Sequence, residues 1–245
     1  MNITKLTRAS KIASIFLREQ LREPISLLWT LISPCVLFYF FTHNIPTGMR
    51  NEDYIQATAG FYAYIACTVA FFGVALYIIG RRESGFIRSF IYTPEAKAIF
   101  LTSHIICYFI AAIVYCITFY IITKPSFGQY SIIEIVEILY KFLTCFVIFC
   151  TPALYLANCR LNFQSANTVI SILIFTITLL ALLTPRTQSK FLETVNTINV
   201  YAISKKIMTG SISLEPPLFI SSLVFTATLS LTSRKLRINP VWSRY

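Results

Sequence analysis

The stretch RRESGFIRSFIYTPEAK, residues 81–97, carries six charged side chains and lies between two long runs that carry none. These runs are Ala57–Gly80 before it and Ala98–Thr123 after it. Each is long enough for a membrane-spanning helix, which needs about 20 apolar residues. A short charged segment between two such runs predicts a turn at a membrane surface, and hence a chain that crosses the bilayer repeatedly.

Composition excludes most other classes of protein. Of the 245 residues, 56% are hydrophobic and 13% are charged, whereas a soluble domain has about 25% charged residues. No GxxxxGK[ST] phosphate loop occurs, so nucleotide binding by this chain is not expected. The seven cysteines form no CxxC pair and are interpreted as small buried apolar residues. His43 and His104 have no ligand partners nearby in the sequence, so neither a metal nor a cofactor is expected.

Six apolar runs meet the length requirement for a membrane span. The predicted fold is therefore all-α, with six transmembrane helices over residues 25–233. A cytoplasmic N-terminus (1–24) and a basic C-terminus (234–245) flank this membrane domain. The six runs are Ile25–Thr42, Ala57–Gly80, Ala98–Thr123, Phe142–Asn158, Ala166–Thr184 and Pro216–Ser233.

The distribution of positive charge predicts the orientation. With six spans both termini share one side, and 14 of the 21 Lys and Arg residues fall on that side. Cytoplasmic loops carry the excess of Lys and Arg, so both termini are predicted to be cytoplasmic in a bacterial plasma membrane. The net charge of +11 is then explained by topology and by anionic lipid headgroups rather than by nucleic acid.

Residues 11–23, KIASIFLREQLRE, have the pattern of an amphipathic helix lying at the membrane interface. Lys11, Arg18 and Arg22 fall on one stripe, and Pro24 ends the helix because it lacks the N–H donor. A plain topology anchor is the alternative interpretation.

The charged stretch 81–97 predicts a short helix at the cytoplasmic surface. Ser84 is a candidate N-cap, and the apolar residues that follow repeat at helical spacing. Thr93 and Pro94 end the helix, because the residue before proline is displaced from helical geometry. Such an elbow would pass force to both neighbouring spans; a solvated loop is the alternative.

Two further segments are predicted on the outer side. Residues 131–141 extend the fourth span outward, and residues 185–215 form short external helices before the last span. These helices either cap an exit path or lie as a surface loop on lipid.

Four tyrosines within or near the spans are candidate pathway-lining residues, because a buried hydroxyl needs a hydrogen-bonding partner. They are Tyr39, Tyr108, Tyr115 and Tyr155. With no Asp, Glu, Lys or Arg inside the spans, the path suits an apolar or amphipathic cargo.

Three stretches resemble the membrane subunit of type-2 ABC exporter permeases. FLREQLREPISLLWTLISPCVLFYF (16–40) resembles the family's connecting helix and first span. RRESGFIRSFIYTPEAKAIF (81–100) resembles its Glu-x-Gly turn, short helix and Thr-Pro, and FLETVNTINVYAISKKIMTGS (191–211) its external helices. Asn199-Val200 stands where the family often has Asn-Pro.

The resemblance implies a permease that pairs with a second permease chain, as a homodimer or heterodimer, and binds two cytoplasmic ABC ATPase subunits. ATP and Mg would then act in the partner, and this chain would not itself be an enzyme. The connecting helix with Lys11, Arg18 and Arg22 would also touch the ATPase. By position, the ATPase-coupling residues are Arg81, Arg82, Glu83, Ser84, Gly85, Phe86 and Arg88.

The leading interpretation is an exporter of an amphipathic drug, antibiotic, peptide or lipid-linked molecule. A polysaccharide or glycoconjugate exporter is the alternative within the family, and an ATP-independent carrier or channel is the alternative of another class. Proton- and sodium-coupled carriers usually hold their ion on ionisable groups within the membrane, and the six runs contain none except His104.

Overall fold

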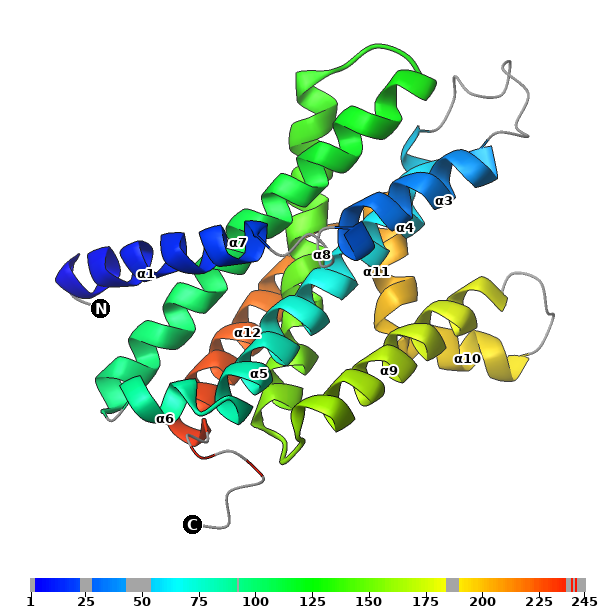
Figure 1. Ribbon diagram of the computed structural model, residues 1–245. Coiled ribbons are helices and arrows are strands. Elements are labelled where there is room, and N and C mark those ends of the chain that lie inside the picture. Colours follow the sequence, from blue (N-terminus) through cyan, green and yellow to red (C-terminus); the bar gives the residue numbers. More distant parts are fainter. Residues whose placement is uncertain are drawn as a thin grey trace.

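The computed structural model describes residues 3–22, 28–42, 54–91, 93–183 and 190–236, together with residues 239 and 241. Within these ranges every regular element is a helix and no strand occurs, which confirms the all-helical prediction. Figure 1 shows the helices packed side by side as an elongated bundle, with α1 crossing its flank.

The elements follow the predicted order along the chain. Where two or three of them join without a break, they form one continuous rod. They are α1 (Ile3–Leu21), a π-helical turn (Leu28–Ile32), α3 (Ser33–Thr42), α4 (Tyr54–Thr68), a π-helical segment (Val69–Leu76), α5 (Tyr77–Glu83), α6 (Phe86–Phe90), α7 (Pro94–Thr123), a 3₁₀ turn (Lys124–Ser126), α8 (Ile132–Asn158), α9 (Phe163–Leu183), α10 (Lys190–Ile198), α11 (Val200–Met208) and α12 (Glu215–Lys235).

Four helical rods in the described chain are long and apolar enough to cross a membrane: Tyr54–Glu83, Pro94–Ser126, Phe163–Leu183 and Glu215–Lys235. They contain the predicted second, third and sixth runs and all of the fifth except Thr184, which lies outside the described residues. The first predicted run falls partly on the shorter apolar helix Trp29–Thr42, and the fourth lies within the 27 residues of α8.

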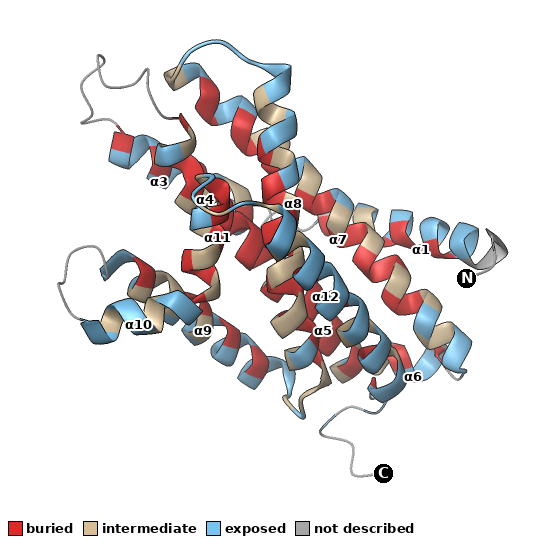
Figure 2. Ribbon diagram, turned by 180° about the vertical axis from the view of Figure 1, so that it is seen from behind, coloured by how far each residue is buried: buried red, intermediate tan, exposed pale blue. Residues whose placement is uncertain are grey.

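The Tyr54–Glu83 rod lies at the centre of the bundle. Its apolar segment is 72% buried, compared with 11% for Glu215–Lys235 at the edge. Figure 2 shows the same gradient, with buried residues inside and exposed residues along α9 and α12. In a membrane-embedded protein, such exposed apolar faces contact lipid or another chain.

One end of the bundle gathers the elbow, the α8–α9 linker and the end of α12. Lys97 Nζ donates a hydrogen bond to the Leu236 carbonyl at 3.2 Å. Asn158 Nδ2 donates to Thr232 Oγ1 at 2.8 Å. These contacts place the last turn of α12 beside both the start of α7 and the end of α8.

The central rod is locally wound as a π-helix over Val69–Leu76. A π-helical segment is uncommon and is often associated with function. His104 on α7 is fully buried, and its Nε2 lies 3.2 Å from the Val74 carbonyl oxygen. The imidazole therefore braces this segment from the neighbouring helix.

The N-terminal helix is longer than predicted and begins at Ile3. Its buried face packs on protein rather than only on lipid. The Phe16 ring lies 5.9 Å from the Phe100 ring on α7, centroid to centroid. The predicted stripe of Lys11, Arg18 and Arg22 is exposed, and Pro24 falls outside the described residues.

The two predicted outer features are present as helices. Ser131 caps α8, accepting a hydrogen bond from the Glu134 amide at 3.4 Å. Residues 190–208 form α10 and α11 with Asn199 at the joint. In α11 Ile207 and Met208 are fully buried, so this helix is part of the core rather than a surface loop.

Candidate functional site

The elbow, the charged stretch of residues 81–97, consists of a tight turn followed by the short helix α6. Gly85 adopts a positive φ of 76° and precedes α6. Ser84 was predicted to cap α6, and this is wrong: its hydroxyl donates back to the Arg81 carbonyl at 3.2 Å. The turn requires a left-handed residue directly before α6, and glycine adopts that conformation without steric cost.

The stop signal after α6 behaves as predicted. The helix ends at Phe90. Thr93 caps α7, accepting a hydrogen bond from the Ala96 amide at 3.1 Å, and Pro94 fills the first helical turn. Ile87 and Ile91 are buried whereas Arg88 is exposed. The elbow is therefore an amphipathic unit with one packed face and one free face.

Arg81 ties the elbow to the N-terminal helix. Its guanidinium pairs with the Glu19 carboxylate of α1 and also contacts the Tyr77 hydroxyl. Tyr77 in turn donates to Glu19 at 2.9 Å. The guanidinium carbon lies 4.3 Å from the Phe86 ring centroid and 4.8 Å from that of Phe16, a cation–π arrangement. The two segments predicted to contact the ATPase, the N-terminal helix and the elbow, therefore meet at the Arg81 guanidinium.

Arg82, the next residue, points into the protein. It is fully buried, and its Nη1 donates to the carbonyls of Ala157 at 3.2 Å and Cys159 at 3.1 Å. Its Nη2 donates to the Leu161 carbonyl, and its Nε donates to Glu83 at 3.0 Å. Among the predicted coupling residues, Arg82 therefore presents no surface to a partner and instead caps the end of α8.

The Glu83 carboxylate accepts a hydrogen bond from the C-terminal tail. Its two carboxylate oxygens lie 3.1 and 3.3 Å from the Val241 amide nitrogen. The same carboxylate pairs with Arg82. The elbow thus contacts α1 through Arg81, the α8–α9 linker through Arg82 and the tail through Glu83.

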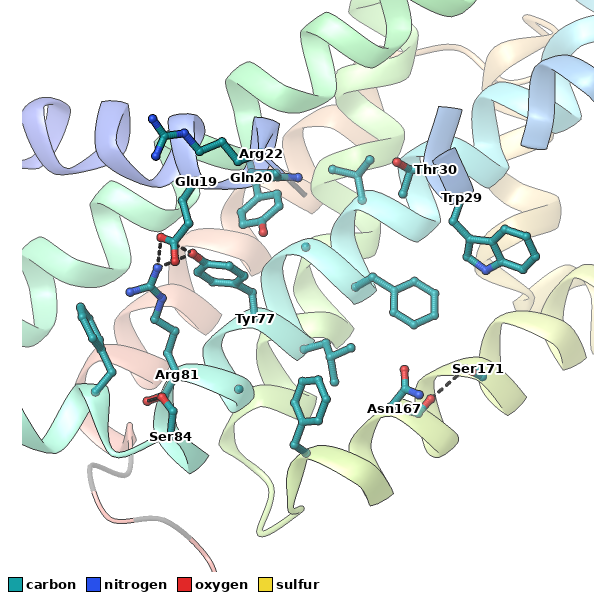
Figure 3. A pocket seen from close by; sticks show the side chains of 18 of the residues that line it. Glu19, Gln20, Arg22, Trp29, Thr30, Tyr77, Arg81, Ser84, Asn167 and Ser171 are labelled. Atoms are coloured by element: carbon teal, nitrogen blue, oxygen red, sulfur yellow. Dashed lines mark hydrogen bonds and ion pairs between the residues drawn. The ribbon is translucent and has the colours of Figure 1, made fainter. Parts of the chain in front are cut away.

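A groove of about 1160 Å³ opens above the elbow, between α1 and α9, with the π-helical segment as its floor. Figure 3 shows Glu19 and Arg81 facing each other at one end, with Asn167 and Ser171 on the opposite wall. The volume is slightly above the range that ligand sites usually have. Most of the remaining lining is aromatic or aliphatic; it includes Trp29, Val69, Phe72, Leu76, Tyr108, Tyr115 and Phe163.

One polar group in the groove lacks a partner. Gln20 is 7% exposed, and its Nε2 donates to the Tyr115 hydroxyl at 3.3 Å. Its Oε1 has no hydrogen-bond partner. A buried amide oxygen without a partner is costly. This oxygen is itself shielded from solvent, so it does not present an acceptor to the groove.

The four candidate pathway tyrosines separate in the structure. Tyr108 and Tyr115 line the groove. Tyr39 does not, because its hydroxyl bonds the Ile122 carbonyl at 2.5 Å near the far end of α7. Tyr155 is 67% exposed on α8 and does not line the groove, so its place on a pathway stays a prediction. It lies one turn from the end of α8, where a phenol can reach the polar boundary.

The predicted connecting residues divide as well. Arg22 lines the groove, whereas Lys11 and Arg18 lie on the exposed face of α1. Glu19, Gln20 and Asn167 were not predicted. Their importance comes from contacts with distant parts of the chain, which spacing along the sequence does not reveal.

No group of three or more His, Cys, Asp or Glu side chains that could hold a metal ion occurs in the described part of the chain. The site therefore consists of hydrogen-bonding, ionic and apolar surfaces.

The fold and the site define an all-helical protein with long apolar helices that are compatible with a membrane. At one end its elbow contacts α1, the α8–α9 linker and the tail, and an amphipathic groove lies beside it. Protein McbE from Escherichia coli is 31% identical over 237 residues, covering 95% of this chain and 98% of that protein. The chain belongs to the same family as Protein McbE. No family model and no solved structure matches it.

Proposed function

We propose that this chain is the transmembrane permease subunit of an ATP-driven ABC exporter that moves an amphipathic compound out of the cytoplasm or the inner leaflet. Six crossings, cytoplasmic termini and a bacterial plasma membrane belong to this proposal. So do a second permease chain, two cytoplasmic ATPase subunits, and ATP with Mg bound in those subunits.

The observation that carries the proposal is the way the elbow is held. A short helix with one exposed face joins two long apolar rods, and Arg81 and Arg82 fix it to both sides of the groove. A partner that pushed on the exposed face would displace the groove's walls. The chain contains no phosphate loop, so in this proposal the energy for such a movement comes from the ATPase subunits.

The groove supports an amphipathic cargo. Its aromatic walls suit the apolar groups of such a cargo. The charged end with Glu19, Arg22 and Arg81 suits a polar head. Stacking of sugars on the same aromatic walls would favour the glycoconjugate alternative, so lipid-linked sugars belong among the compounds tested.

The experiment uses the chain co-expressed with a candidate ABC ATPase in vesicles. Glu83→Ala removes the acceptor at the elbow, and Gly85→Pro cannot adopt the observed positive φ. Both variants should insert into the membrane, but export should fall at least about tenfold relative to ATP hydrolysis, the size expected when geometry is lost at a critical contact.

Gly128→Pro is the matched control. Gly128 also has a positive φ, of 130°, with open space around it, but it lies in the turn at the opposite end of α7. Normal export by both elbow variants would reject the elbow as the coupling element. Transport by the purified chain without any nucleotide would favour the carrier or channel alternative.

A further inference from the structure

Arg82 is the largest fully buried side chain in the described structure. Burying a guanidinium is costly unless its donors are all bonded. Here three of the bonds go to backbone carbonyls at the end of α8 and in the linker that follows. A helix leaves its last carbonyls unpaired, and its C-terminus favours a cation, so the contact satisfies both sides.

The linker held by Arg82 leads directly into the far wall of the groove. Only residues 159–162 separate α8 from α9. Asn162 directly precedes α9, and its Oδ1 accepts a hydrogen bond from the Ser165 amide in the first turn at 2.7 Å. A Cβ atom on Gly80 would lie 3.3 Å from the Phe163 ring, so the first turn of α9 packs closely on α5. Phe163, Asn167 and Ser171 of this wall line the groove.

The near wall is held differently. The Arg81 side chain is 13% exposed and that of Glu19 is 47% exposed. Ion pairs in contact with water contribute little and are easily exchanged. The buried, multiply bonded Arg82 contact is of the kind that is strongly destabilising to break. The direct contact of the elbow with α1 is therefore weaker than its contact with the α8–α9 linker. The α1 wall is held mainly by its packing on α7, where Phe16 meets Phe100.

We propose that Arg82 is a positioning residue that makes the elbow and the α9 wall one rigid unit, while the Arg81–Glu19 contact lets the α1 wall part from it. The groove then opens by separation of α1 from the elbow. In the exporter proposed above, the elbow would carry α9 with it, and this last step rests on that proposed function.

The test measures distances between spin labels in the full chain, reconstituted in lipid nanodiscs with Cys159→Ser as background. One pair, Ser89→Cys with Gln164→Cys, reports elbow to α9. The other pair, Ser89→Cys with Ser14→Cys, reports elbow to α1; all three positions are exposed. The elbow–α9 distribution should be narrow and single, and the elbow–α1 distribution should be wider or double.

Arg82→Lys keeps the charge but cannot match the planar fork that reaches three carbonyls. It should widen the elbow–α9 distribution about twofold and leave the elbow–α1 distribution unchanged. Arg81→Lys, the matched variant at the neighbouring position, should do the reverse. Gel filtration and thermal unfolding show whether each variant is folded.

An elbow–α9 distribution as wide as the elbow–α1 distribution in the parent chain would overturn the proposal. Because both distributions are measured in the parent chain, this comparison tests the proposal even if Arg82→Lys fails to fold. An unchanged elbow–α9 width in folded Arg82→Lys would overturn it as well. With the ATPase present, Arg82→Lys should lose cargo-stimulated hydrolysis; if no ATPase binds the parent chain, the proposed function fails but the distance result stands.

Discussion

The Tyr108 ring of α7 fills the space beside Gly73 in which any other residue would place its Cβ atom. A Cβ built on Gly73 would lie 2.3 Å from Tyr108 Cε1 and 2.5 Å from Cδ1. The contact falls within the π-helical segment that forms the floor of the groove. One turn away, His104 braces the Val74 carbonyl. The floor is therefore fixed by close packing from α7.

Gly73→Ala should destabilise the protein by about 1–3 kcal/mol, the usual cost of overpacking a core. Thermal unfolding in detergent measures the effect. Gly60→Ala is the matched control, because its Cβ would meet only Tyr201 Oη at 3.5 Å, and it should be neutral or slightly stabilising. In a Tyr108→Ala background the Gly73→Ala cost should largely disappear. An equal cost in both backgrounds would contradict the steric explanation.

The parts of the fold that the sequence predicts are those with local signals. Long apolar runs predict the rods, and Thr93-Pro94 predicts the end of the helix in the elbow. The elbow's position between two rods follows from charge alone. These features depend on residues within a few positions of one another, which is the range over which periodicity and capping act.

The missed features depend on contacts across the sequence. Arg82 bonds to carbonyls about 75 residues away, and every residue has a carbonyl, so no side-chain pattern marks the acceptors. The hydrogen bond between His104 and the Val74 carbonyl also joins distant residues through a backbone acceptor, so no sequence pattern marks it. Ser84 was mistaken for a cap because its type is right, whereas the turn geometry selects Gly85. Burial of α11 likewise depends on its packing against other helices.

Glu19→Gln should loosen α1 from the elbow without unfolding the protein. The change in stability should stay below about 1 kcal/mol, because the pair is partly exposed to solvent. Hydrogen exchange of the α1 amides should accelerate. As the salt concentration is raised, the exchange rate of the α1 amides in the parent chain should approach that of the variant, because salt screens such ion pairs.

Glu137→Gln is the control for this variant. Glu137 pairs with Lys141 at 2.6 Å, and its side chain is 52% exposed, close to the 47% of Glu19. It lies on α8, far from α1 in the bundle. If α1 exchange responded equally to both substitutions, or to neither, the Arg81–Glu19 contact would not be what holds α1.

Asn199→Ala should destabilise the α10–α11 joint by about 1–2 kcal/mol, the upper range for an N-cap. The Asn199 side chain accepts from the Tyr201 amide at 3.0 Å and donates to the Ile177 carbonyl of α9 at 2.8 Å. Asn199→Ser keeps the bond to the Tyr201 amide and loses the bond to the Ile177 carbonyl. Its unfolding temperature should therefore lie between those of Asn199→Ala and the parent chain. Thr197→Ala, an exposed neighbour, should change little; a similar loss there would point to general sensitivity of the segment.

Tyr201 gives α11 a second polar anchor. Its hydroxyl donates to the Gly60 carbonyl at 2.8 Å, and burial raises the pKa of this phenol, so it stays protonated and able to donate. Deleting residues 191–207 would remove this anchored core helix together with α10. Any test of an exit cap should therefore alter only the exposed side chains of α10, such as Phe191 and Ile198.

Cys159 should be the one thiol that a membrane-impermeant maleimide modifies in the folded chain, because reaction requires an accessible thiol. Cys159 is partly exposed in the α8–α9 linker, and the other six cysteines are buried. The linker lies at the elbow end through its bond to Arg82, and this end carries most of the Lys and Arg. With the orientation proposed above, the positive-inside rule predicts that Cys159 faces the cytoplasm. Inside-out vesicles should incorporate about one label per chain, right-side-out vesicles almost none, and Cys159→Ser should abolish labelling in both. Labelling only from the outer face would invert the topology and place the elbow where no cytoplasmic ATPase could reach it.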